Sequence, residues 1–459
     1  MVALSERKIE IVRRLVEAAP DKVVGGLRAA LAETADDSAL AGVRRLVESE
    51  ARDRALRNAV LLPIVPMCVG DGSDSGRLTF PSRVVALIWR GLKAIDPDGV
   101  DDAAAALGDY HPGESSNEPF DALVQAAAGA LRGRQTHEFV LAAEACEAAR
   151  PGGVDRLAQC LDIAPVVRTA IPKLAEWSAH LGEETTASTR LAYKDAVAIA
   201  EDAGQRFFEM IAAHMPYPWM VLRIISSVMD KPNERYLADS EMAMFGERVM
   251  AEIEATLASV ARLDPDAGAA AGRAAAKSVE LITFQISEME TCVDLSRDHG
   301  WGHEIGNKRR ALAAVVEAHL RTAEKLALAV LPTQVVKMAR IRKTVPRLNA
   351  MPDPIAIRRA ITLLTFANEV RTSANYGGFA AARGKMLESL GDMLDNYVEE
   401  VLDHLRTGDV EDEGVAYAFL EVAAEVSLLV RGERAAELVR RRAAASRHND
   451  PPRAEAEAS

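Results

Sequence analysis

The sequence predicts an all-α, multi-helix protein, with shorter N-terminal helices and an antiparallel bundle of long helices in the C-terminal half. Apolar residues make up 49% of the 459 residues, enough to bury a substantial core, whereas aromatic residues make up only 5%. Alanine recurs throughout and alternating β-branched runs are almost absent, which favours helices packed through small side chains. A chain of this length favours roughly two to four domains.

The N-terminal region reads as a helical pair over residues 1–62. Ser5 is a suitable N-cap for a first helix, which stops near Pro20 because proline cannot continue it. A second helix runs from about Asp36 to Pro63. The irregular, glycine-rich stretch that follows marks a boundary between this pair and the next region.

The middle of the chain divides by helix length. Residues 80–180 hold shorter helices separated by turn signals, such as DPDG at 96–99 and PGG at 151–153. Beyond residue 183 the apolar pattern predicts helices of about 25 to 32 residues. We therefore expect a long-helix bundle over residues 183–350.

The C-terminal region should contain further helices over residues 353–443. Asp264 and Asp353 each stand directly before a proline, the arrangement typical of an N-cap followed by the first helical residue. Residues 444–459 are polar and rich in proline and alanine, so we expect a disordered tail there.

The segment RDHGWGHEIGNKRR at 297–310 contains the densest group of chemically active side chains. In a continuous helix His299 and His303 would lie on one face, as metal ligands often do. Two glycines lie between them, however, and such a pair favours a turn where one helix ends and another begins. We therefore predict a helical corner packed on Trp301, with no metal site and no cofactor.

Charge is the most informative feature of the sequence. The chain has a net charge of −13, yet residues 297–385 carry sixteen Lys and Arg against six Asp and Glu, a net charge of +10. Residues 386–430 then carry twelve acidic residues and one arginine. The predicted basic surface comprises Lys308, Arg309, Arg310, Lys337, Arg340, Arg342, Lys343, Arg347, Arg358 and Arg359.

Two interpretations of this basic segment stay open. The acidic helices of residues 386–430 could fold onto it and neutralise it, through exposed pairs worth roughly 0 to 1 kcal/mol each. Alternatively, the segment presents a surface to an acidic protein, an anionic lipid or a polynucleotide. The low aromatic content and the acidic chain as a whole disfavour nucleic acid.

The leading hypothesis for function is a non-enzymatic adaptor, scaffold or regulator that binds another protein with an acidic or helical surface. No catalytic residue is assigned under this hypothesis. The first alternative is a helical enzyme with a pocket near residues 214–236 and 297–310. Its residues would be His214, Arg235, His299, His303 and Glu304. The second alternative is peripheral binding of lipid or nucleic acid by residues 297–385.

Cysteine usage and hydropathy bear on location. Cys68, Cys146, Cys160 and Cys292 stand far apart in the sequence, which suggests neither a zinc site nor a disulfide framework and fits a reducing cytoplasm. The first residues are interspersed with charges, unlike a secretory signal. The longest apolar run is far shorter than the roughly 20 residues that a membrane-spanning helix needs.

Overall fold

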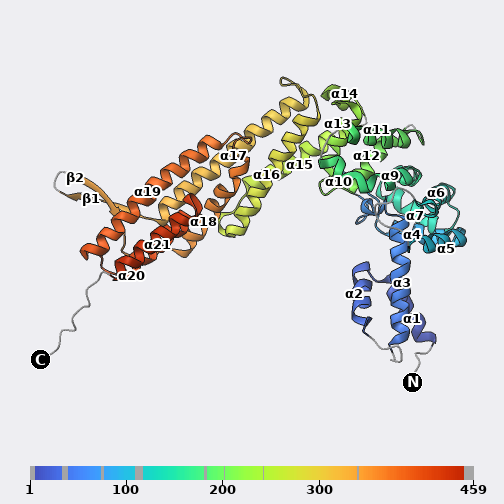
Figure 1. The fold of residues 1–459 in the computed structure, drawn as a ribbon, viewed down its shortest axis with the longest axis horizontal. Helices are drawn as coiled ribbons and strands as arrows, with labels where there is room; N and C mark the ends of the chain where they lie inside the picture. The colour runs from blue at the N-terminus through green and yellow to red at the C-terminus, as the bar shows by residue number, and fades with distance from the viewer. Residues whose placement is uncertain are drawn as a thin grey trace. The chain divides into compact units, whose positions relative to one another are not determined.

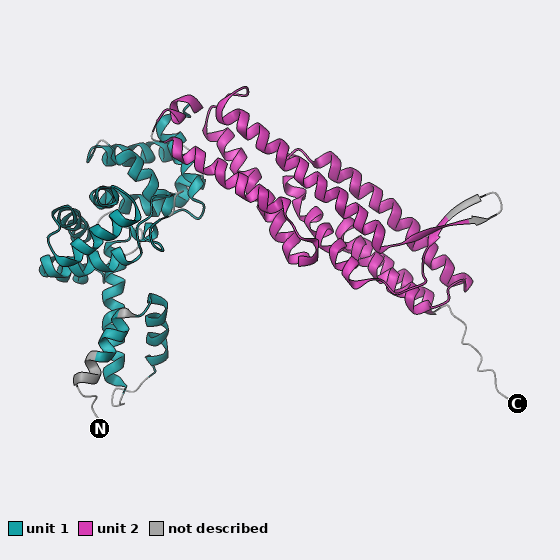
Figure 2. Cartoon of the chain, turned by 180° about the vertical axis from the view of Figure 1, so that it is seen from behind, with its two compact units in different colours: residues 1–232 teal, residues 233–459 magenta. Residues whose placement is uncertain are grey.

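The computed structural model describes residues 6–33, 40–73, 77–108, 117–179, 183–200, 202–240, 242–338 and 341–448. Most of these residues lie in helices, which confirms the predicted all-α, multi-helix class (Figure 1). The chain forms two compact units, Met1–Pro232 and Asn233–Ser459 (Figure 2). The predicted N-cap Ser5 and the predicted helix start at Asp36 lie outside the described residues.

Unit 1 consists of short and medium helices. In chain order they are α1 (Glu6–Ala18), α2 (Asp21–Leu31), α3 (Ala41–Val60), η1 (Val65–Met67), α4 (Arg83–Ile95), α5 (Pro97–Ala106), α6 (Glu118–Gly133), α7 (His137–Ala149), α8 (Gly153–Asp162), α9 (Ala164–Ala170), η2 (Ile171–Lys173), α10 (Leu174–Ala179), α11 (Glu183–Val197), α12 (Ala203–Ala213), η3 (Pro218–Met220) and α13 (Val221–Met229).

The hydrophobic core of unit 1 has a small part and a large part. Helices α1 and α2 both pack on α3 around a few valines. The larger core lies among α4, α6, α7, α8 and α12, where Phe120, Phe139 and Phe207 are completely buried. Local capping fixes two of these helices, because the side chains of Asn117 and Thr136 accept hydrogen bonds from the first turns of α6 and α7.

Unit 2 contains the longest helices. In chain order its elements are α14 (Glu234–Ala238), α15 (Ala243–Ala261), η4 (Pro265–Ala267), α16 (Ala269–Cys292), α17 (Gly300–Val330), β1 (Thr333–Met338), β2 (Ile341–Pro346), α18 (Pro354–Glu369), η5 (Val370–Ser373), α19 (Ala380–Thr407), α20 (Glu413–Arg431) and α21 (Glu433–His448).

The long helices of unit 2 lie side by side in Figures 1 and 2. Helix α18 packs against α16 and α17, α17 packs against α19, and α20 packs against α18, α19 and α21. Leu312, Val316, Phe366 and Leu390 are completely buried between them. Asp353 caps α18 as predicted, since its carboxylate accepts a hydrogen bond of 2.9 Å from the backbone N–H of Ile355.

The expected lengthening of the helices at residue 183 is wrong. Helices α11, α12 and α13 have 15, 11 and 9 residues, and the first helix longer than 20 residues is α16. Helix α11 ends at Val197, and prolines at positions 216, 218 and 232 interrupt the apolar pattern further on. The expected bundle of residues 183–350 therefore straddles the division between the two units at Pro232.

Two further expectations about the C-terminal half need correction. The segment after α17 forms an antiparallel hairpin, the one sheet among the described residues, whereas no strand was expected. Valine and threonine in both strands favour this extended structure. The tail was expected to be disordered from residue 444, but α21 continues to His448; residues 449–459 lie outside the described residues.

Candidate functional site

The predicted corner lies at the start of the segment 297–310, and its shape depends on a distant glutamate. Helix α16 ends at Cys292 and α17 begins at Gly300, so residues 300–310 are helical. The buried carboxylate of Glu234 accepts hydrogen bonds from the backbone N–H groups of Ser296 (3.1 Å) and Gly302 (3.0 Å). Glu234 therefore accepts hydrogen bonds at the N-terminus of α17 and offsets the partial positive charge of that helix end. The residue that precedes the helix, His299, forms no side-chain cap.

The two glycines of this corner lie where a side chain would not fit. Gly300 has a φ of +61°, and a Cβ atom there would lie 2.4 Å from the carboxylate of Glu234. A Cβ atom at Gly302 would lie 1.9 Å from the carbonyl oxygen of Ser296. The predicted role of Trp301 also holds, since its indole is buried against Gly246 of α15. The glycine pattern thus has a structural explanation.

The residues of the enzyme hypothesis are divided between the two units. His214 is in unit 1, half-buried, with its Nε2 atom 3.2 Å from the carbonyl oxygen of Pro63. His299 and His303 are exposed in unit 2, and the Nδ1 atom of His299 lies 2.9 Å from the hydroxyl of Ser296. Within the described residues, no group of three or more His, Cys, Asp or Glu is arranged to hold a metal ion.

Burial shifts the acid–base properties of a few groups in unit 1. It lowers the pKa of His214 below the ordinary value of 6.5, because the positive imidazolium loses its hydration. Burial also raises the pKa of the Cys146 thiol to about 12. All four cysteines are buried and free of disulfides, so the neutral thiol is the favoured form of Cys146 near neutral pH.

Two residues of the predicted basic surface on α17 are paired with carboxylates of earlier helices. The ammonium group of Lys308 lies 3.1 Å from a carboxylate oxygen of Glu254 on α15. The guanidinium of Arg309 forms an ion pair with Glu290 on α16 and donates a hydrogen bond of 3.1 Å to Tyr376. Burial, together with the adjacent Glu290, raises the pKa of Tyr376 to about 12.

The remaining described basic side chains lie at the surface of unit 2. Arg359 on α18 forms two hydrogen bonds to the carboxylate of Asp266, and these bonds lower the pKa of that carboxyl group. Arg310 and Arg347 are exposed and hydrogen-bond to nearby asparagine side chains. Arg358 is also exposed and lines a groove beside α18.

The four other predicted basic residues belong to the hairpin. The strand register places Lys337 opposite Arg342 and Val336 opposite Lys343. Arg340 lies outside the described residues. Residues 326–352 carry five basic residues and no acidic residue, so the hairpin and its flanks contain no carboxylate of their own.

Several carboxylates of the acidic segment 386–430 pair with arginines near the C-terminal end. Arg431, Arg440 and Arg442 contact Asp395, Glu421 and Glu399, in that order. The described carboxylate partners of Lys308, Arg309 and Arg359 come instead from residues 254–290. Among the described ion pairs, the carboxylates of residues 386–430 therefore pair with arginines outside the basic segment 297–385.

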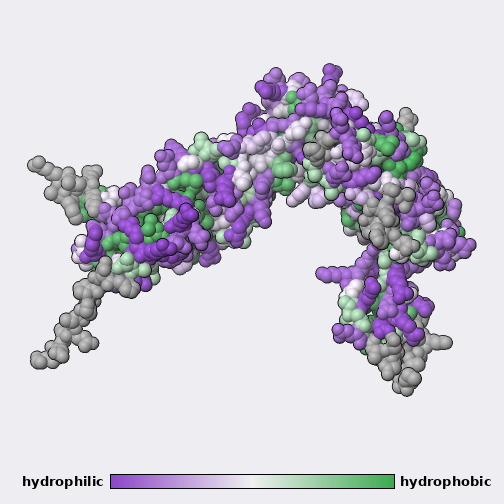
Figure 3. Space-filling view, viewed as in Figure 1, coloured by the Kyte–Doolittle hydropathy of each residue, from purple (hydrophilic) through white to green (hydrophobic). Residues whose placement is uncertain are grey.

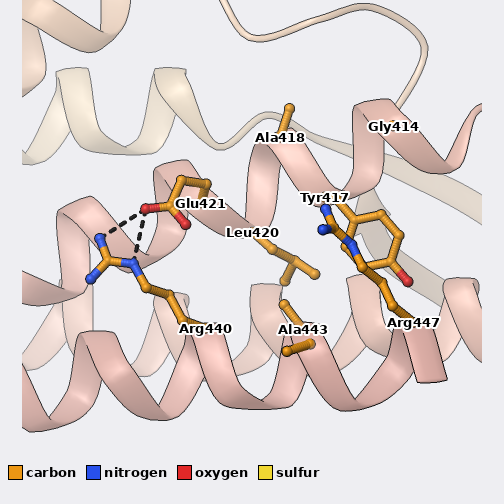
Figure 4. A pocket seen from close by; sticks show the side chains of 9 residues that line it. Gly414, Tyr417, Ala418, Leu420, Glu421, Arg440, Ala443 and Arg447 are labelled. Atoms are coloured by element: carbon orange, nitrogen blue, oxygen red, sulfur yellow. Dashed lines mark hydrogen bonds and ion pairs between the residues drawn. The ribbon is translucent and has the colours of Figure 1, made fainter. Parts of the chain in front are cut away.

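Two grooves flank α20 in unit 2. One, of about 490 Å³, lies between α20 and α21 (Figure 4). There Arg440 pairs with Glu421, and the guanidinium of Arg447 lies 4.1 Å from the ring centroid of Tyr417. The other, of about 570 Å³, lies between α18 and α20 and shares Glu421 with the first. Figure 3 shows hydrophobic areas between hydrophilic ones on the surface of unit 2.

Sequence reasoning missed two structural features of unit 2, for different reasons. Glu234 precedes the helix that it caps by 66 residues, so no local pattern announces its role. The hairpin did carry a signal, because β-branched residues lie on both sides of a short connection, bounded by Pro332 and Pro346.

Comparison with known proteins gives no indication of function. No protein-family model matches the chain, and no match was found among curated proteins or solved structures. Within the described residues, every helix is too short or too polar to cross a membrane.

Proposed function

We propose that this protein is a non-enzymatic helical scaffold or adaptor that binds an acidic protein partner through the basic hairpin of unit 2. The observation that carries the proposal is the composition of residues 326–352, with five cations and no carboxylate. These residues include the hairpin, which extends beyond the helices of unit 2 in Figure 1. An acidic partner would complement this charge.

The pairing of the other basic residues supports the hairpin as the contact region. Lys308, Arg309 and Arg359 already have carboxylate partners within unit 2, so a new partner would have to compete for them. The hairpin lacks such partners in its own segment. Charges of this kind contribute more to the rate and orientation of association than to its affinity.

A protein partner suits the overall charge better than a polynucleotide does. Removing residues 297–385 from the count leaves −23 for the rest of the chain, which repels a nucleic acid approaching from most directions. The sequence also has few aromatic residues for stacking on bases. An acidic protein of modest size can contact the hairpin without following the rest of the surface.

The test is purification of the full chain from cells that produce it naturally, beside a variant with Arg340, Arg342 and Lys343 changed to Glu. We expect a stoichiometric acidic protein to accompany the natural chain, to dissociate as salt rises, and to be absent from the variant. Recovery of nucleic acid or lipid with the natural chain, or equal recovery of the protein with both chains, would contradict the proposal.

A further inference from the structure

The hydrogen bonding of the hairpin identifies which backbone groups point outward. The N–H of Arg347 donates a hydrogen bond of 2.9 Å to the carbonyl of Pro332. These two residues lie directly beyond the last register pair of the strands, Thr333 and Pro346. Antiparallel pairs alternate between hydrogen-bonded and non-hydrogen-bonded types. The register therefore makes Val335 opposite Thr344, and Lys337 opposite Arg342, non-hydrogen-bonded pairs. The N–H and C=O groups of such residues face away from the neighbouring strand.

The two outer edges of this hairpin differ. Strand β2 packs against α19, and its Pro346 has no N–H to offer at the outward position opposite Thr333. Strand β1 presents the outward backbone groups of Thr333, Val335 and Lys337. Among the described residues the sheet has no third strand, so the β1 edge is the one suited to further pairing.

The composition of the hairpin shows what kind of strand fits this edge. Residues 326–352 carry five basic residues and no acidic residue, so a strand rich in carboxylates complements their charge. Two-stranded hairpins are only marginally stable in water. A third strand with carboxylates would add both backbone hydrogen bonds and opposite charge. The exposed Val335, with 63% of its surface accessible, provides an apolar contact for the added strand.

We propose that the β1 edge, from Thr333 to Met338, binds an extended acidic segment of the protein partner as a third strand. This inference rests on the proposed function and specifies its binding mode. Backbone hydrogen bonds would supply affinity, and the alternation of acidic and β-branched side chains would supply specificity. The partner segment would need about four to six residues in extended conformation to match β1.

The experiment measures binding of two labelled peptides to the full chain by fluorescence anisotropy. One peptide alternates Glu and Val, and the other has the same sequence with every backbone amide nitrogen methylated, so length and charge are equal; methylation removes the backbone donors. Two variants form a matched pair. Val335→Pro removes an outward N–H of β1, whereas Thr344→Pro removes the outward N–H of the opposed residue on β2. Neither substitution removes a hydrogen bond between the two strands.

We expect the natural chain to prefer the Glu–Val peptide and Val335→Pro to weaken binding by about tenfold, while Thr344→Pro changes it little. Val335→Thr, which keeps the N–H and β-branching, should bind like the natural chain. Equal binding of both peptides, or equal effects of both prolines, would overturn strand addition.

A fourth variant separates failure of this inference from failure of the proposed function. Changing Lys337 and Arg342 to Glu should abolish binding of both acidic peptides. If that loss occurs while the two proline variants behave alike, the hairpin binds acidic protein by charge alone and only strand addition is overturned. If neither peptide binds, or if a short DNA duplex or a phosphatidylserine vesicle binds in preference, both proposals are overturned.

Discussion

Backbone groups at several helix ends in this protein hydrogen-bond to charged side chains that lie far away in the sequence. The buried guanidinium of Arg168 donates hydrogen bonds to the carbonyls of Ala59 (2.7 Å) and Val60 (2.6 Å), at the end of α3. Arg54 donates in the same way to the carbonyl of Val16 at the end of α1. Glu234 performs the complementary task at the start of α17. These residues stabilise the connections between helices that local sequence leaves without partners.

The corner at α17 gives a matched pair of glycine substitutions. Gly300→Ala should lower the free energy of unfolding by about 1 to 3 kcal/mol, because its φ is +61° and its Cβ would meet Glu234. Gly306→Ala, in the same helix with no atom near its Cβ, should raise it by up to about 1 kcal/mol. Urea unfolding measures both, and equal effects would contradict the proposed role of the corner.

His214 should make the stability of unit 1 depend on pH. Because burial lowers its pKa in the folded state, protons bind more readily to the unfolded chain below the ordinary value of 6.5. Stability should therefore fall as pH decreases through 6.5, by at most about 1.4 kcal/mol per pH unit. His214→Gln keeps a donor for the carbonyl of Pro63 and should flatten this dependence. If the unfolding free energy of His214→Gln depends on pH between 5 and 7 as steeply as that of the natural chain, His214 is not the source of the dependence.

At the scale of elements, close helix packing depends on individual small residues. Gly272 of α16 lies so near α18 that a Cβ atom would be 2.3 Å from the carbonyl oxygen of Thr362. In unit 1, a Cβ atom at Gly204 of α12 would be 2.8 Å from the hydroxyl of Tyr193. The high alanine content thus reflects a wider use of small residues where helices approach closely.

Gly272→Ala should therefore separate α16 from α18. The expected cost is about 1 to 3 kcal/mol of unfolding free energy, because backbone cannot move aside as a flexible side chain can. Gly384→Ala on α19 is a suitable control, since no atom lies within 4 Å of its Cβ position. Chemical denaturation of both variants tests this, and a neutral Gly272→Ala would show that the two helices tolerate a wider spacing.

At the scale of the whole molecule, the chain consists of two compact units. The predicted boundaries at residues 62, 80 and 183 fall within unit 1, and their status as domain boundaries stays a prediction. The charge asymmetry belongs to unit 2 alone, where both the basic and the acidic segments lie. Folding and partner binding can consequently be examined separately by substitution.

The two units should respond separately to destabilisation. Arg168→Ala leaves the carboxylate of Asp121 and two carbonyls of α3 without their donor, so it should speed amide exchange in unit 1. Gly272→Ala should speed exchange in unit 2 only. Hydrogen-exchange mass spectrometry of the full chain distinguishes these outcomes; loss of protection throughout both units in either variant would show a single cooperative structure instead.

The sequence by itself determined the helical class, the cap at Asp353 and the corner at residues 297–310. These features follow from interactions within a few residues: side-chain caps, proline geometry and the backbone freedom of glycine. Only the tertiary structure decided that Glu234 completes that corner, that carboxylates of residues 254–290 pair with Lys308, Arg309 and Arg359, and that the chain divides at Pro232. Such choices depend on which distant residues the packed helices bring together, and no local pattern encodes them.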